Sequence, residues 1–241
     1  MQIKILGNKG KLSCELRKFN SKNIKSKEIL QKSNQISKTI KVATYSPTLK
    51  ADTKDNFNKE ISYYKSLIKQ LDNSSHLVFI SSQTLELTNI TFYSQAKDTI
   101  EKMLIKNLKN YTIIRPGMIF DQENKSYLLN QMNYASKSFF SFYNDISKIT
   151  ICSTKDIYDL IDYISHNTDK LNLQIINIGL KRYRFFELQS KYKKKHRLSI
   201  IPFLLLRLIS KIHIRLKAYV NGQAISCSPS LGWRSSFDLI N

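Results

Sequence analysis

Residues 76–120 read HLVFISSQTLELTNITFYSQAKDTIEKMLIKNLKNYTIIRPGMIF, and this stretch decides the fold. A short apolar run, residues 77–80, ends in two serines, which is typical of a buried strand. From Tyr93 onward the apolar residues recur at helical spacing, and a second apolar run, residues 111–115, ends at a Pro-Gly pair. The stretch therefore predicts a strand, a helix and a second strand, with Ser82 at the exit of the first strand.

Three polar side chains in this stretch suggest a proton-transfer site. Tyr93 and Lys97 are one helical turn apart, so their side chains share a helix face. A free tyrosine has a pKa near 10, and a lysine ammonium or a positively charged nicotinamide beside it favours the phenolate. A serine hydroxyl at the strand exit, Ser82, can hold a substrate oxygen while the tyrosine moves its proton. The pattern predicts proton transfer coupled to hydride transfer.

The beginning of the chain predicts a phosphate-binding turn. Residues 2–6 form an apolar strand, and the spacing Gly-x-x-Gly-x-x-Ser follows before a helix. Two glycines allow the backbone to turn tightly and approach a pyrophosphate, which the helix N-terminus then holds. The third position usually takes Gly or Ala, and Ser13 is small enough to stand there. The predicted cofactor-binding residues of this turn are Gly7, Gly10, Lys11 and Leu12.

Between this turn and residue 76 the sequence signals for strands and helices are weaker. Residues 20–40 are too short and too polar for a full strand–helix–strand unit, so either a strand pair is lost or cofactor binding is weakened. Glu28 is the one candidate for the ribose-binding carboxylate, although a surface glutamate is the favoured interpretation. A strand over 41–45 and an amphipathic helix over 58–71 follow. Asn58, at the start of this helix, is a candidate helix cap.

Beyond residue 120 the order of elements continues. We expect a strand over 149–152 and a helix from residue 155. Residues 203–220 predict a basic apolar helix, for which two interpretations stay open: docking on a substrate lobe, which is favoured, or contact with an anionic membrane surface. The most apolar run, 200–206, is shorter than the roughly 20 residues that span a bilayer.

Together these motifs resemble the extended short-chain dehydrogenase/reductase family, in particular its UDP-galactose 4-epimerase-like, NAD-dependent epimerases and dehydratases, in a trimmed form. In that family the equivalents of Ser82, Tyr93 and Lys97 are the catalytic triad. Residues 114–117, Ile-Arg-Pro-Gly, resemble the family's strand beside the nicotinamide, and residues 231–233, Leu-Gly-Trp, resemble its closing motif. Met118 stands where the family usually has Asn.

The resemblance implies an α/β fold with a doubly wound, mostly parallel sheet. It implies a dinucleotide-binding domain over 1–165 and a small C-terminal substrate lobe over 166–241. The implied activity is that of a nucleotide-sugar epimerase, dehydratase or reductase in surface-polysaccharide synthesis, and a non-catalytic relative acting as a sensor or scaffold is the alternative. The implied cofactor is NAD or NADP, with contacts beyond the glycine turn from Tyr45, Ser46, Asn58, Tyr93, Lys97 and Pro116.

The composition narrows the classes of partner. The net charge of +21 suggests nucleic-acid binding, but the lysines are spread along the chain, which favours a diffuse basic surface and no specific nucleic acid. Three scattered cysteines argue against a disulfide framework, and four histidines at separate places predict no metal site. The N-terminus shows no signal-peptide pattern, so we expect a cytoplasmic protein. A nucleotide-sugar substrate is the predicted partner, and a homodimer is left open.

Overall fold

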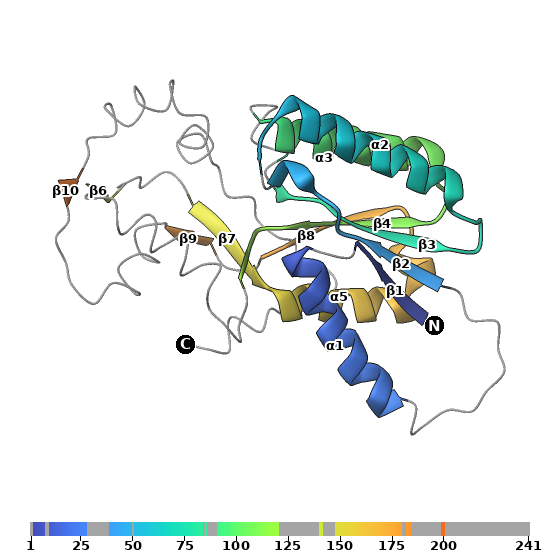
Figure 1. Ribbon diagram of the computed structural model, residues 1–241. Helices are drawn as coiled ribbons and strands as arrows, with labels where there is room; N and C mark the ends of the chain where they lie inside the picture. Colours follow the sequence, from blue (N-terminus) through green and yellow to red (C-terminus); the bar gives the residue numbers. More distant parts are fainter. Residues whose placement is uncertain are drawn as a thin grey trace.

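A five-stranded parallel sheet forms the centre of the computed structural model (Figure 1). The structure describes residues 2–7, 10–27, 39–49, 51–83, 85, 91–120, 140–141, 148–179, 182–184 and 199–200. In the order β1-β2-β3-β4-β8, the strands are β1 (Gln2–Leu6), β2 (Thr39–Ala43), β3 (His76–Ile80), β4 (Tyr111–Pro116) and β8 (Gln174–Ile178). All four pairings are parallel, which confirms the predicted α/β class.

The middle strands are buried on both faces, as their continuous apolar runs predict. Every residue of β3 is buried, and so are all residues of β4 except Arg115, which is half-buried. Parallel strands that are covered on both faces have this composition because neither face contacts water. The central stretch of the sequence therefore lies at the centre of the sheet.

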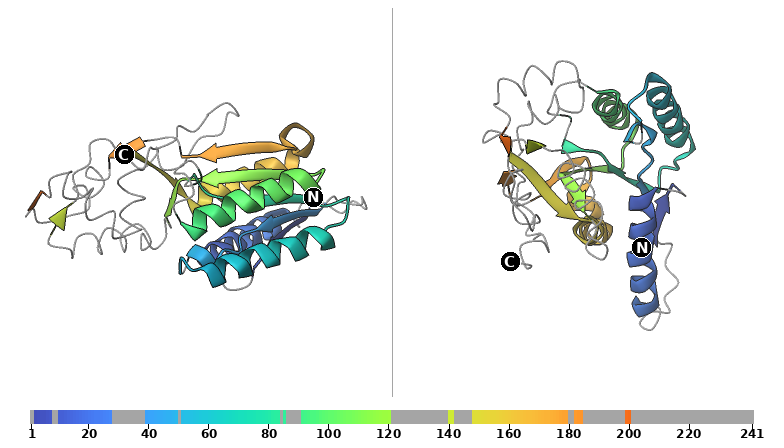
Figure 2. Two further views of the ribbon diagram at one scale, coloured as in Figure 1. Left: turned by 90° about the horizontal axis from the view of Figure 1, so that it is seen from above. Right: turned by 60° about the vertical axis from the view of Figure 1, so that its left-hand side comes forward.

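Helices cover both faces of the sheet, which makes it doubly wound (Figures 1 and 2). One face packs against α1 (Lys11–Lys27) and α5 (Thr154–His166). The other packs against α2 (Lys54–Gln70) and α3 (Phe92–Asn107). Leu16 of α1 joins the first core, and Tyr64 and Ile100 of α2 and α3 join the second.

The strand order has a consequence for the connections. The five strands follow one another across the sheet in chain order, without a reversal among the described strands. When two strand–helix–strand connections step across the sheet in the same direction but pass over opposite faces, one is right-handed and the other left-handed. The connections through α1 and α5 therefore differ in hand from those through α2 and α3, although nearly all parallel connections are right-handed. Among the described residues, β1 pairs only with β2, so it forms one edge of the sheet.

Two smaller sheets accompany the main sheet, and one of them continues from the carboxyl end of β4. Strand β5 (Met118–Phe120) pairs in parallel with β7 (Lys148–Ser153), which pairs antiparallel with β9 (Arg182–Arg184). Strand β6 (Phe140–Ser141) pairs with β10 (Ser199–Ile200). A 3-10 turn, η1 (Pro47–Leu49), and a short helix, α6 (Thr168–Leu171), complete the described elements.

Gly117 joins β4 to β5, and its lack of a side chain explains the Pro-Gly pair. A Cβ atom at this position would lie 2.3 Å from Thr150 Oγ1 and 2.4 Å from the Thr150 carbonyl oxygen. Strand β7 therefore passes so close that only glycine fits. The Gly117 N–H donates to the Ile178 carbonyl at 3.0 Å, which fixes the joint to β8.

Several expectations fall beyond what the structure describes. Glu28, residues 203–220 and residues 231–233 lie outside the described residues, so the division at 165/166 stays a prediction. Strand β8 follows that boundary in the chain and nevertheless completes the main sheet through β4. Among the described residues, the helices are too short or too polar to cross a membrane.

Candidate active site

Ser82 lies two residues beyond the end of β3, and its neighbours on both sides hold it there. The Ser81 N–H donates to the Ile114 carbonyl at 2.8 Å. The Gln83 amide donates to the carbonyls of Arg115 (3.2 Å) and Ile178 (2.8 Å), and its oxygen accepts from Thr150 Oγ1. Ser82 itself is buried. The carboxyl ends of β3, β4 and β8 thus meet around this serine.

Tyr93 and Lys97 lie in the first turns of α3, directly beside Ser82. A capping box of Thr91 and Ser94 starts the helix, and the Tyr93 N–H donates to Asp52 Oδ1 at 2.9 Å. The side chains of Tyr93 and Ser82 are hydrogen-bonded. The three residues predicted from sequence therefore come together at the carboxyl edge of the sheet.

The protonation of Tyr93 differs from the sequence-based expectation. Burial raises the pKa of Tyr93 to about 12, the hydrogen bond with Ser82 lowers it, and the Glu60 carboxylate raises it. We expected Lys97 to favour the phenolate. In the structure the loss of hydration of the phenolate outweighs that attraction, so Tyr93 holds its proton at neutral pH.

Lys97 explains this difference because a carboxylate already balances its charge. Its ammonium lies 3.2 Å from Glu60 Oε1 and 3.4 Å from the Ile80 carbonyl, and it lies 5.6 Å from the centre of the Tyr93 ring. The Lys97 side chain is 2 % exposed and that of Glu60 is fully buried. Burial lowers the pKa of Lys97, and Glu60 raises it.

Glu60 is a site residue that the sequence analysis missed. Its second oxygen, Oε2, accepts hydrogen bonds from Ser46 Oγ (3.2 Å), from the Thr48 N–H (3.3 Å) and from the Thr48 hydroxyl. The signal was present in the sequence, since Glu60 precedes Tyr64 by one turn on the apolar face of its helix. A carboxylate on that face must find partners inside the protein.

A second ion pair lies one turn further along α3. Arg115 of β4 donates to both oxygens of Glu101, at 3.0 Å from Nε and 2.6 Å from Nη2. The Ser81 hydroxyl donates to Glu101 Oε1. This bidentate pair fixes α3 against the strand ends. The spacing of Tyr93, Lys97 and Glu101 at intervals of four residues puts Glu101 on the same helix face, but does not identify Arg115 as its partner.

The turn between β1 and α1 has the features that a pyrophosphate requires. Gly7 has a φ of +98°, which favours glycine, and a Cβ atom there would lie 3.3 Å from Thr44 Oγ1. Gly10 directly precedes α1, and the buried Ser13 hydroxyl donates to its carbonyl at 2.7 Å. Lys11 and Leu12 open the helix. The positive φ of Gly7 and the start of this long helix are compatible with a dinucleotide phosphate, whose contact with this turn stays a prediction.

The other predicted cofactor contacts are spread over three elements. Tyr45 and Ser46 follow β2, and the Tyr45 ring packs on Tyr63 with the ring centres 4.5 Å apart. Pro116 is buried at the end of β4. Asn58 is exposed on α2, which begins at Lys54 with Thr53 as its N-cap, so Asn58 neither opens nor caps that helix. Its cofactor contact stays a prediction.

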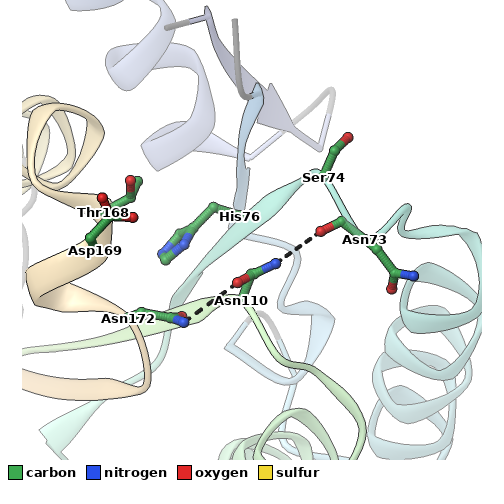
Figure 3. Close-up of a pocket in the computed structure, with 7 residues that line it drawn as sticks. All are labelled: Asn73, Ser74, His76, Asn110, Thr168, Asp169 and Asn172. Atoms are coloured by element: carbon green, nitrogen blue, oxygen red, sulfur yellow. Dashed lines mark hydrogen bonds between the residues drawn. The ribbon is translucent and has the colours of Figure 1, made fainter.

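A small polar pocket lies at the opposite edge of the sheet (Figure 3). It has a volume of about 110 Å³, and amide side chains from the starts of β3, β4 and β8 surround it: Asn73, Asn110 and Asn172. His76 lines it and shares a 2.8 Å hydrogen bond with the Thr112 hydroxyl. Because parallel strands start at this edge and end at the other, the pocket is separate from Ser82.

Solved structures similar to this chain include enzymes that act on nucleotide sugars. UDP-glucose 4-epimerase from Thermotoga maritima, solved with UDP-glucose, has a TM-score of 0.67 at 12% identity, over 98% of this chain and 94% of that chain. The dTDP-glucose 4,6-dehydratase from Bacillus anthracis, solved with NAD, has a TM-score of 0.61 at 10% identity, over 83% and 84%. RMD from Pseudomonas aeruginosa, solved with NADPH, has a TM-score of 0.61 at 10% identity, over 98% and 94%.

A search of protein-family models and a search of curated protein sequences found no match. At these identities the structural similarity concerns the fold. The parallel sheet, its two helix layers and the near-complete overlap agree with the resemblance that the motifs suggested. The chain therefore has the Rossmann-like fold of the extended short-chain dehydrogenases/reductases, the fold of the NAD-dependent epimerases and dehydratases.

Proposed function

We propose that the chain is an NAD(P)-dependent nucleotide-sugar epimerase, dehydratase or reductase that serves surface-polysaccharide synthesis in the cytoplasm. One observation carries this proposal: Ser82, Tyr93 and Lys97 converge, largely buried, where the parallel strands end. Ligands of open α/β sheets bind at this edge. The solved structures with the same fold include complexes with a nucleotide sugar, NAD or NADPH, which supports the substrate and cofactor classes.

The cofactor would lie along the ends of β1 and β2. Gly7, Gly10 and the start of α1 would hold its pyrophosphate, and Tyr45 and Ser46 would contact it where β2 ends. Pro116 and Lys97 would lie at its nicotinamide end. When bound, a nicotinamide cofactor supplies hydride transfer.

The residues of the chain supply proton transfer and orientation. Ser82 would donate a hydrogen bond to the reacting oxygen of the sugar. Tyr93, already hydrogen-bonded to Ser82, would exchange its proton with the same oxygen. Lys97 lies under the Tyr93 ring and would orient the cofactor ribose. Ser82 and Lys97 are buried and Tyr93 is half-buried, so the site would limit the access of bulk water to the reacting oxygen.

Cofactor binding tests this proposal without a known substrate. We expect calorimetry to detect binding of NAD or NADP, oxidised or reduced. Gly7→Val should abolish binding because its φ of +98° strains any β-branched residue. Gly179→Val is the matched control, since Gly179 also has a positive φ, +133°, but follows β8. Undetectable binding of all four cofactor forms at millimolar concentration would contradict the proposal. A turnover screen of nucleotide sugars with both cofactors then identifies the reaction.

A second candidate function has a specific observation in its favour. In a non-catalytic sensor or scaffold that binds the cofactor, Tyr93 need not ionise, and its pKa is raised to about 12. The buried pair of Lys97 with Glu60 also occupies the ammonium that would assist ionisation. Cofactor binding without turnover in the same screen would favour this candidate over the enzyme.

The remaining partner proposals concern surfaces. A diffuse +21 charge predicts weak DNA binding that falls steeply with salt and shows no sequence preference. Membrane contact through residues 203–220 predicts co-sedimentation with anionic vesicles and not with neutral ones. Sedimentation velocity decides between a monomer and a homodimer. Sequence-specific DNA binding at physiological salt, or equal binding to both vesicle types, would contradict the respective proposal.

A further inference from the structure

The two outermost strands of the main sheet, β1 and β8, lie at its opposite margins (Figure 2). Among the described residues, β1 pairs only with β2, and β8 pairs only with β4. A strand directs the backbone N–H and C=O groups of alternate residues to its two sides, so an edge strand leaves half of these groups for another partner. The two edges of this sheet differ in how those groups are satisfied.

The β1 edge is closed by side chains of α1. The Leu6 carbonyl faces β2, where it accepts from the Thr44 hydroxyl at 3.2 Å. The carbonyls that alternate with it face outward: those of Ile3, Ile5 and Gly7. Asn20 of α1 donates to the first of these at 3.2 Å, and Arg17 donates to the other two. Helix α1 thus supplies the donors that a neighbouring strand would otherwise supply.

The backbone of β8 lacks this cover. The Gly117 N–H, directly after β4, donates to the Ile178 carbonyl at 3.0 Å, so Ile178 and Ile176 direct their backbone groups to β4. Ile175 and Asn177 alternate with them and direct their own N–H and C=O groups to the open side. Within the described part of the chain, no side chain donates to these two carbonyls in the way that α1 does at β1.

An unsatisfied polar atom marks the same edge. Asn177 Oδ1 is buried, and it has no hydrogen-bond partner within the part of the chain that the structure describes. The side chains of Ile176 and Ile178 join the core under α1 and α5, so the Asn177 side chain lies on the α3 face of β8. A buried amide oxygen without a donor is costly. This position therefore favours a partner that brings a donor to the β8 edge.

Exposed apolar side chains adjoin the open backbone. Leu173, directly before β8, is 54 % exposed, and Ile175 is exposed as well. Ile105 of α3 is 49 % exposed and lies one turn beyond Glu101, which reaches Arg115 of β4. Ile105 therefore lies on the side of α3 that faces β4 and β8. The open edge and these three side chains form one surface, which we call the β8 surface.

The charge of the chain indicates which partner fits the β8 surface. Residues 171–179 carry no charged side chain, although the net charge of the chain is +21. Two copies of so basic a chain repel each other, so they can associate only through an uncharged contact. A strand edge that presents both donors and acceptors is complementary to itself, as a two-fold contact requires. An acidic partner would instead find its complement among the lysines elsewhere on the chain.

We propose that the β8 surface is an interface between two copies of this chain, which pair their β8 strands antiparallel about a two-fold axis. With Ile176 on the axis, Ile175 of each copy exchanges both backbone hydrogen bonds with Asn177 of the other, so every outward group is paired. The two Asn177 side chains then lie on a diagonal, within reach of each other's amides. Ile105 and Leu173 add apolar area to the contact. This interface does not depend on the proposed activity.

Sedimentation velocity of the full chain, from micromolar to millimolar concentration, tests the interface. We expect a monomer–dimer equilibrium in the wild type. Ile175→Lys places two ammonium groups in the contact and should weaken dimerisation by about tenfold or more, because the symmetry repeats the change. Tyr163→Lys is the matched control, since Tyr163 is also exposed but lies on α5, and it should leave the dimer unchanged. A monomeric wild type, or a dimer that Ile175→Lys leaves intact, would overturn the proposal.

Amide hydrogen exchange followed by NMR locates the contact in the wild type itself. Exchange at Ile175 and Asn177 should slow as the protein concentration rises, whereas exchange at Ile3 and Ile5 should not change. Ile175→Pro removes one outward N–H at an edge position where proline is tolerated, and it should shift the equilibrium toward the monomer. Ile3→Pro makes the same change at the closed edge and should not. Exchange at Ile175 and Asn177 that does not depend on concentration would overturn the proposal, even if a variant failed to fold.

Discussion

The two helix layers of the protein satisfy their buried carboxylates in different ways. In the α1–α5 layer, Asp156 is fully buried and accepts from the Ser153 N–H at 2.7 Å, three residues away in the chain. In the α2–α3 layer, Glu60 and Glu101 bind partners that lie 37 and 14 residues away. The first layer uses a carboxylate to start a helix. The second uses carboxylates to join elements, and the candidate site lies beside them.

This difference shows why chemistry gathers on one face. A helix cap is satisfied by its own backbone and needs no other element. A carboxylate that pairs across elements fixes their relative positions, and it also holds an ammonium or guanidinium inside the protein. The α2–α3 layer thus carries the buried charges that act on Tyr93 and Lys97.

Removal of the Tyr93 hydroxyl should have the largest effect on activity. If it does not, the candidate site does not lie beside the α2–α3 layer. Tyr93→Phe keeps the ring but removes the exchangeable proton, so turnover on an identified substrate should fall by roughly 10²–10⁴, with cofactor affinity little changed. Tyr158→Phe, in the α1–α5 layer, removes the hydroxyl that contacts Asn20 and should leave turnover unchanged. Steady-state kinetics decide this. Near-wild-type turnover of Tyr93→Phe would disprove the assignment of the site.

Breaking the ion pair of Glu101 should be nearly as costly, but in stability. Glu101→Ala leaves the half-buried Arg115 without its bidentate partner; breaking a fully buried ion pair costs about 3–5 kcal/mol, so we expect a loss near the lower end of that range. Glu15→Ala removes a pair with an exposed lysine on the other layer, which should cost about 0.5 kcal/mol beyond the lost packing. Urea unfolding monitored by circular dichroism measures both. Equal losses would show that the two layers do not differ in how they use carboxylates.

Apolar packing should not distinguish the layers. Leu16 of α1 and Leu104 of α3 are both fully buried, one in each core. Each Leu→Ala change should therefore lower the free energy of unfolding by about 2–5 kcal/mol, with no systematic difference between the layers. The same urea experiment applies. A loss below about 1 kcal/mol at either position would mean that this leucine is not packed in its core as the structure shows.

The smallest effect concerns Asp72, an exposed carboxylate after α2 whose partners are mainly local. It accepts from the Ser74 N–H at 3.1 Å, from the hydroxyls of Ser74 and Ser75, and from the Lys41 ammonium at 3.2 Å, and these bonds hold its pKa well below the usual range. A lowered pKa gives stability that is present above the unfolded value, near 4, and is lost as the pH falls toward the folded value. Asp72→Asn should lose less stability than the wild type between pH 5 and pH 2 in urea unfolding. An identical pH dependence would contradict the local bonding.

The sequence predicted the elements of the sheet well because their signals are local. The apolar runs of β3 and β4 and the helical spacing of α3 depend on which residues must face a core, and the structure confirms each. The glycine turn before α1 was predictable because its signal is also local: Gly7 has the positive φ that such a turn requires. The start of α2 was placed too late, because its true cap, Thr53, lies in polar sequence that shows no periodicity.

The sequence by itself determined the order of strands and helices, the glycine turn before α1, and the placement of Ser82, Tyr93 and Lys97 at one edge, because strand ends and helical spacing fix those positions locally. Tertiary structure alone decided the ion pairs. Glu60 reaches Lys97 only because α2 packs on α3, and Arg115 reaches Glu101 only because β4 lies under that helix. The raised pKa of Tyr93 also depends on tertiary structure, because its causes are loss of hydration and the carboxylate of Glu60 on another helix. Residue spacing shows the lysine one turn away but neither of these causes.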